Sequence, residues 1–243
     1  MKKAFNLTNW HVFYYLGLLF LLTFSNNIRA QEQSGLSFGI KGGLASGTFT
    51  TQNRLQVGSA HMGMQIGTFV NYNVMEFLGV SMEVLYSNTG ATNVDPEYFY
   101  ALENATSSQR IVNTSVVSHQ ISIPILISYI FPEMSDGVSP KIYVGGDMSF
   151  NLLSNSQNTF ATSFKSNTIY STEYTSMGNR LAKNDFGLII GTGITLGSGA
   201  IVYTFDARYR LGLSNINEAF SSYANSDLKR DIFSLMIGVA YKL

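Results

Sequence analysis

The feature that most constrains this chain is the alternation of apolar and polar residues along several segments of about ten residues. In residues 201–213 the odd-numbered positions hold the large apolar side chains, and the even-numbered positions hold Asp206, Arg208 and Arg210. We call each such set of alternate positions a parity. Successive side chains of a β-strand point to opposite faces. The segment therefore predicts a strand with one apolar face and one charged face.

Eight such segments follow one another along the chain. They are residues 36–44, 62–72, 78–86, 117–129, 141–152, 185–196, 201–213 and 233–243. Each has roughly the 9–11 residues that a tilted strand needs to cross a bilayer. Eight is also an even number, as in single-chain bacterial outer-membrane barrels.

The connections between these segments alternate between long and short. Polar stretches run over about 45–60, 88–115, 154–183 and 214–230, and short joins lie near 73–76, 132–140 and 197–199. Long extracellular loops and short periplasmic turns are typical of membrane barrels. The pattern predicts an all-β fold, an eight-stranded antiparallel transmembrane β-barrel of the small OmpA/OmpX type. Both termini are then expected in the periplasm.

Composition separates this prediction from a soluble β-barrel or sandwich. Charged residues make up 12% of the chain and aromatic residues 13%, whereas an average soluble domain carries about 25% charged residues. In several segments the polar parity holds mostly Gly, Ser and Thr, which suits a crowded, filled interior. Without cysteine, the chain has no disulfide framework, no thiol chemistry and no lipoprotein anchor.

The first thirty residues resemble a secretory signal peptide. Lys2 and Lys3 precede an apolar run over residues 12–24, which is shorter than the ~20 residues of a membrane-spanning helix. We expect cleavage between Ala30 and Gln31, which leaves residues 31–243 as the barrel domain. Residues 1–30 hold three basic residues and no acidic ones, so the mature chain has a net charge of −3. Nucleic acid is therefore not an expected partner.

Several motifs resemble the PorT-like outer-membrane β-barrel family of Gram-negative bacteria that use type IX secretion. The matching pieces are FGIKGGL at 38–44, ISIPILISY at 121–129, YVGG at 143–146, DFGL at 185–188 and DARYRLGLSN at 206–215. The resemblance spans nearly all of the mature chain and implies the same fold and location. An accessory role in secretion is what the resemblance to PorT itself implies.

The polar parity also predicts a set of charged residues inside the barrel. They are Lys41, Glu83, Asp147, Asp206, Arg208 and Arg210, three acids and three bases. Because unpaired buried charges are costly, we interpret them as a structural salt-bridge cluster. A narrow ion path or a ligand clamp is the alternative.

No catalytic, cofactor-binding or metal-binding set emerges from the sequence. His61 and His119 have no metal-ligand spacing. His119 falls on the outward parity, as a lipid A-modifying enzyme with a Ser–His pair would require, but no serine stands two residues further on. We therefore expect a non-enzymatic protein, without cofactors, that acts through its long loops. Its expected partners are outer-membrane lipid, the barrel-assembly machinery, and secretion-machine proteins or surface ligands. A narrow pore and a lipid A-modifying enzyme remain the alternatives.

Overall fold

The computed structural model describes residues 35–95, 109–134, 137–164, 167–177, 180–218 and 227–243. The predicted signal peptide and its cleavage site at Ala30 and Gln31 lie outside these residues. The described chain forms nine strands, and they are β1 (Leu36–Thr51), β2 (Gln56–Met75), β3 (Leu78–Val94), β4 (Gln109–Ile130), β5 (Val138–Phe164), β6 (Asn167–Ser176), β7 (Asn184–Leu196), β8 (Ile201–Gly212) and β9 (Leu228–Lys242). Among these residues no helix combines the length and the apolar character needed to cross a membrane.

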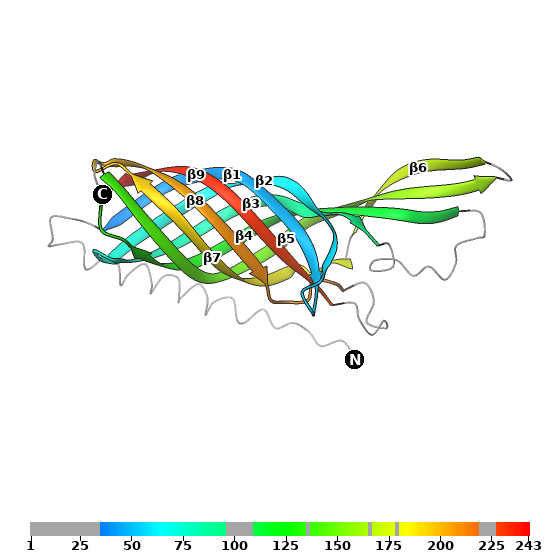
Figure 1. Ribbon diagram of the computed structural model, residues 1–243, viewed down its shortest axis with the longest axis horizontal. Coiled ribbons are helices and arrows are strands. Elements are labelled where there is room, and N and C mark those ends of the chain that lie inside the picture. The colour runs from blue at the N-terminus through cyan, green and yellow to red at the C-terminus, as the bar shows by residue number, and fades with distance from the viewer. Residues whose placement is uncertain (1–34, 96–108, 135–136, 165–166, 178–179, 219–226) are drawn as a thin grey trace, which may run out of the picture. The chain divides into compact units, whose positions relative to one another are not determined.

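Eight of the strands close into a ring (Figure 1). Each strand pairs antiparallel with its neighbours in the order β1-β2-β3-β4-β5-β7-β8-β9, and β9 pairs with β1 to close the barrel. The remaining strand, β6, pairs with residues 155–164 of β5 and lies outside the ring. The predicted eight-stranded antiparallel barrel is confirmed.

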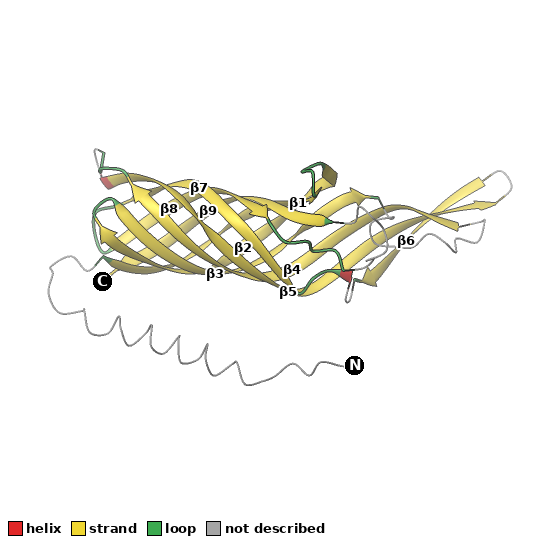
Figure 2. Ribbon diagram, turned by 90° about the horizontal axis from the view of Figure 1, so that it is seen from below, coloured by secondary structure: helices red, strands yellow, loops and turns green. Residues whose placement is uncertain are grey.

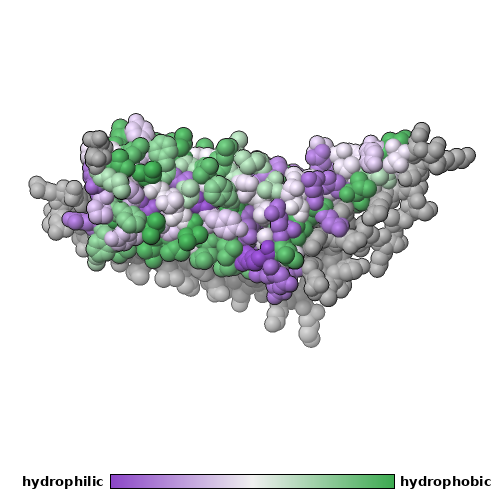
Figure 3. Space-filling model, viewed as in Figure 1, coloured by the Kyte–Doolittle hydropathy of each residue, from purple (hydrophilic) through white to green (hydrophobic). Residues whose placement is uncertain are grey.

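The wall of the barrel is apolar outside and polar inside. Along β8 the burial alternates residue by residue, with Tyr203, Phe205 and Tyr209 exposed and Thr204, Asp206 and Arg208 buried. The same alternation runs through β7 and β9. Figure 3 shows hydrophobic residues over most of the barrel face in view, with hydrophilic residues gathered toward one end. This arrangement matches a wall that faces lipid.

The two ends of the barrel differ. The connections β2–β3, β4–β5 and β7–β8 lie at one end, which we call the turn end, and the start of β1 pairs with the end of β9 there. Gly197 closes the β7–β8 turn with a φ of 113°, in a region that side chains rarely adopt. The connections at the opposite end, the loop end, include β6 (Figure 2).

The prediction that the long connections are loops was wrong in part. The stretch 45–60 is mostly strand, because β1 continues to Thr51 and β2 begins at Gln56. The stretches 88–115 and 154–183 contain the ends of β3, β4 and β5 and the whole of β6. These extensions are rich in Ser, Thr and Asn, so they lack the apolar parity that reveals a strand in sequence. Antiparallel pairing between the strand backbones holds these extensions together without an apolar face.

Candidate functional site

Buried ion pairs cross the interior of the barrel. Those nearer the turn end form what we call the turn-side cluster, which consists of Lys41, Glu83, Lys141, Asp206 and Arg208. The Lys41 ammonium lies 2.8 Å from Glu83 and 3.1 Å from Asp206, and Lys141 lies 3.2 Å from Asp206. Arg208 donates to both oxygens of Glu83, at 2.7 and 3.1 Å. The cluster ties β1, β3, β5 and β8 together across the lumen.

Aromatic rings support the cations of the turn-side cluster. The Lys41 ammonium lies 4.5 Å from the centroid of the Phe69 ring. Arg208 and Lys141 lie 5.5 and 5.8 Å from the centroid of the Tyr143 ring. Cation–π contacts of this kind gain strength where water is excluded, so the rings help to hold the charges inside the barrel.

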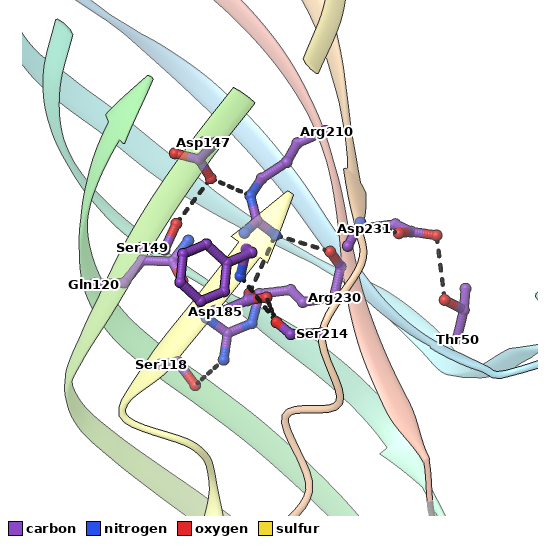
Figure 4. Close-up of polar contacts among 12 residues, drawn as sticks. Thr50, Ser118, Gln120, Asp147, Ser149, Asp185, Arg210, Ser214, Arg230 and Asp231 are labelled. Atoms are coloured by element: carbon purple, nitrogen blue, oxygen red, sulfur yellow. Dashed lines mark hydrogen bonds and ion pairs between the residues drawn. The ribbon is translucent and has the colours of Figure 1, made fainter. Parts of the chain in front are cut away.

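A second group, which we call the loop-side cluster, consists of Asp147, Asp185, Arg210 and Arg230 (Figure 4). Arg210 pairs with Asp147 and lies 3.1 Å from Asp185. Its guanidinium also donates to the carbonyl oxygen of Arg230 at 3.0 Å. Arg230 in turn donates to Gln120 and to the Ser118 hydroxyl. The cluster links β4, β5, β7, β8 and β9, and its formal charges balance.

Glycines on the inner face of β7 make room for these large side chains. A Cβ at Gly187 would lie 2.8 Å from the Arg210 guanidinium, and one at Gly193 would lie 2.5 Å from the Asp206 carboxylate. Real Cβ atoms essentially never approach other heavy atoms so closely. The small residues on the inner face of β7 therefore leave the space that the charged side chains of β8 occupy.

All six charged residues that the sequence assigned to the interior are buried. They divide into two groups, with Lys41, Glu83, Asp206 and Arg208 in the turn-side cluster and Asp147 and Arg210 in the loop-side cluster.

Sequence reasoning missed three further members. Lys141 and Asp185 stand on the polar parity of their segments, so the same alternation could have included them. Arg230 was assigned to a loop, because β9 begins at Leu228, before the apolar alternation becomes visible.

The sequence also raised His119 and metal-ligand spacing as chemical candidates. His119 lies on the outer face of β4, with its Nδ1 2.6 Å from the Tyr86 hydroxyl, so its partner is a tyrosine and not the serine of a Ser–His pair. Within the described ranges, no group of three or more His, Cys, Asp or Glu residues could hold a metal ion.

A sheet of three strands extends the barrel wall at the loop end. The first residues of β4, the last residues of β5 and the whole of β6 form it, with Gln109 opposite Thr162 and Phe160 opposite Ser171. Strand β6 is the last in the strand order, so within the described part of the chain its outer edge has no strand partner. Ile169, Tyr170 and Tyr174 on it are 57%, 67% and 79% exposed. We call this part the loop-end sheet.

Comparison with known proteins identifies the class to which this fold belongs. The model of a family described as "outer membrane protein beta-barrel domain" matches residues 24–218. The chain therefore belongs to this outer-membrane β-barrel family, and its place is the bacterial outer membrane. A search of curated protein sequences returned no match.

Several solved structures are similar to the chain. Neisserial surface protein A is 16% identical, with 88% of this chain and 100% of that chain covered and a TM-score of 0.43. OprG from Pseudomonas aeruginosa is 16% identical, with coverages of 87% and 97% and a TM-score of 0.45. The attachment invasion locus protein Ail of Yersinia pestis is 13% identical, with coverages of 86% and 99% and a TM-score of 0.38.

Proposed function

We propose that the protein is a non-enzymatic outer-membrane barrel that binds a protein partner at its loop end. The observation that carries this proposal is the outer edge of β6 in the loop-end sheet. An unpaired strand edge presents a row of backbone donors and acceptors that an extended segment of another protein can complete. Soluble proteins commonly protect such edges with charged residues, especially Lys, or with Pro. Strand β6 contains one charged residue, Glu173, and neither Lys nor Pro.

The exposed side chains of β6 support the same proposal. Tyrosine supplies large contact area at low entropic cost and is enriched at protein interfaces. Tyr170 and Tyr174 are among the most exposed large side chains of the described residues. Their partners on β5 lie beyond the part of β5 that pairs with β7, so both tyrosines lie outside the barrel wall. We infer that the loop end faces the cell exterior and that both termini are periplasmic, as in other barrels with short periplasmic turns.

The partner that we propose is a component of a secretion or surface-assembly machine. This finer assignment rests on the motif resemblance to the PorT-like family, including ISIPILISY at 121–129 and DARYRLGLSN at 206–215. Outer-membrane lipid surrounds the barrel, and the barrel-assembly machinery is the partner during insertion.

A crosslinking experiment in intact outer membranes tests the proposal. A photoreactive amino acid replaces Tyr174 in one variant and Ile190, an exposed side chain in the middle of β7, in the matched control. We expect a discrete crosslinked secretion-machine protein from position 174 and none from position 190. Crosslinks to lipid alone at both positions would contradict partner binding at β6.

Two further measurements separate the alternatives. A reproducible open conductance level that changes in Arg208→Ala would favour a narrow pore over an interior filled by ion pairs. A mass shift of lipid A that depends on the protein would favour a lipid A-modifying enzyme.

A further inference from the structure

A polar chamber of about 120 Å³ lies inside the barrel on the turn-end side of the turn-side cluster. Residues at the strand ends, including Ser37, Asn73 and Lys242, line its outer part. The charged groups of Lys41, Lys141 and Asp206 line its inner part, together with Thr204. The chamber has room for several water molecules or one small solute.

The charges around this chamber do not balance. The turn-side cluster holds the three cations Lys41, Lys141 and Arg208, but its only carboxylates among the described residues are Glu83 and Asp206. Apart from Lys141, its side chains are at most 4% exposed. A buried charge without a counter-charge is strongly destabilising, so the cluster favours an additional negative charge nearby.

The geometry shows which cation lacks a carboxylate of its own. Arg208 occupies both oxygens of Glu83, and Lys41 lies between Glu83 and Asp206. Lys141 has Asp206 alone, which it shares with Lys41. Its side chain is also the most accessible of the cluster, at 16% exposed. An anion that enters the chamber past Lys242, which lines its outer part, therefore meets Lys141.

Thr204 provides a second, independent observation. Its side chain is 2% exposed, it lines the chamber, and its hydroxyl has no hydrogen-bond partner within the described residues. A buried hydroxyl without a partner costs free energy that a bound acceptor would recover. An ammonium group and a hydroxyl are both donors to an oxyanion.

We propose that this chamber binds a small oxyanion, such as the phosphate or carboxylate group of a soluble ligand. Lys141 is its main charge partner, and Thr204 donates a hydrogen bond to it. The proposal concerns the turn end of the barrel and is independent of partner binding at the loop-end sheet.

Isothermal titration calorimetry of the purified barrel in detergent tests the proposal. Inorganic phosphate and acetate are titrated separately at constant ionic strength, so that the two arms distinguish a phosphate from a carboxylate ligand. We expect one saturable site per chain for at least one of them. Lys141→Met should weaken binding roughly tenfold or more, because it removes the main charge partner of the anion. Thr204→Val should weaken it by a smaller factor, because it removes one uncharged hydrogen-bond donor.

The matched control is Lys229→Met, which removes a lysine at the loop end of β9 and should leave binding unchanged. Lys141→Met leaves two cations and two carboxylates in the turn-side cluster, so we expect it to fold. Its thermal midpoint should no longer rise with phosphate or acetate, whereas that of the wild type should. Absence of saturable binding in the wild type, or equal binding in Lys141→Met, would overturn the proposal.

Discussion

The barrel and the loop-end sheet share β4 and β5 but differ in how the edges of their strands are paired. In the barrel every strand has two neighbours, the outer face is apolar and the inner face holds paired charges. In the loop-end sheet β4 and β5 continue beyond the ring, and β6 ends the sheet with an edge that carries Ile169, Tyr170 and Tyr174. A closed ring removes the edges through which β-sheets associate, whereas an open sheet presents one. We therefore assign stability to the barrel and propose that recognition takes place at the extension.

The largest effect is expected when the interior charges lose a partner. Glu83→Gln leaves Arg208 and Lys41 with less counter-charge in a buried site. Breaking a buried ion pair on one side typically costs about 3–5 kcal/mol, and we expect a loss of this size in the free energy of unfolding. Urea unfolding of the refolded barrel, followed by circular dichroism, measures it.

A double-mutant cycle provides the control for this prediction. Glu83→Gln combined with Arg208→Gln should cost less than the sum of the two single changes, because the two residues interact directly. A single-variant loss below about 1 kcal/mol, the range of exposed ion pairs, would show that the cluster is not part of what stabilises the barrel.

The outer wall provides the next largest effect. Ile190 lies in the middle of β7 and is 62% exposed, so Ile190→Lys places a charge against lipid. A lysine at the bilayer midplane costs about 2–4 kcal/mol in outer-membrane barrels. Tyr174→Lys in the loop-end sheet faces water and should change stability by no more than about 0.5 kcal/mol. Unfolding in phospholipid vesicles measures both, and similar losses for the two variants would break the distinction between the regions.

A smaller loss of stability is expected when an inward-facing glycine of the barrel is replaced by alanine. A Cβ at Gly193 meets the Asp206 carboxylate, the Lys141 side chain and the backbone carbonyl oxygen of Phe205, whereas one at Gly146 meets nothing within 4 Å. Gly193→Ala should therefore cost about 1–3 kcal/mol through overpacking. Gly146→Ala is the matched control, and an equal cost for both would show that the loss comes from the strand backbone and not from the cluster.

The sequence allowed the barrel to be predicted better than its extension, and the reason is physical. A lipid bilayer forces an apolar face onto each crossing strand, so segments such as 201–213 reveal both strand and orientation. Water imposes no such pattern on β6, where Thr and Ser stand on both parities, and the sequence therefore suggested a loop. The parity rule also assigned Lys41 and Asp206 to one interior, but it gives no distances. It could not divide the charges into two clusters or show that Lys141 shares Asp206.

Shortening the hairpin formed by β5 and β6 tests the division between barrel and extension most directly. Asn158 and Glu173 are opposite each other in this hairpin, so residues 159–172 can be replaced by Asn-Gly, the sequence of a tight two-residue turn. We predict that the free energy of unfolding changes by less than about 0.5 kcal/mol, as for other surface changes. Crosslinking of the partner, probed from position 174, should be lost in the shortened chain. A loss of several kcal/mol, or partner crosslinking that persists in the shortened chain, would contradict the account.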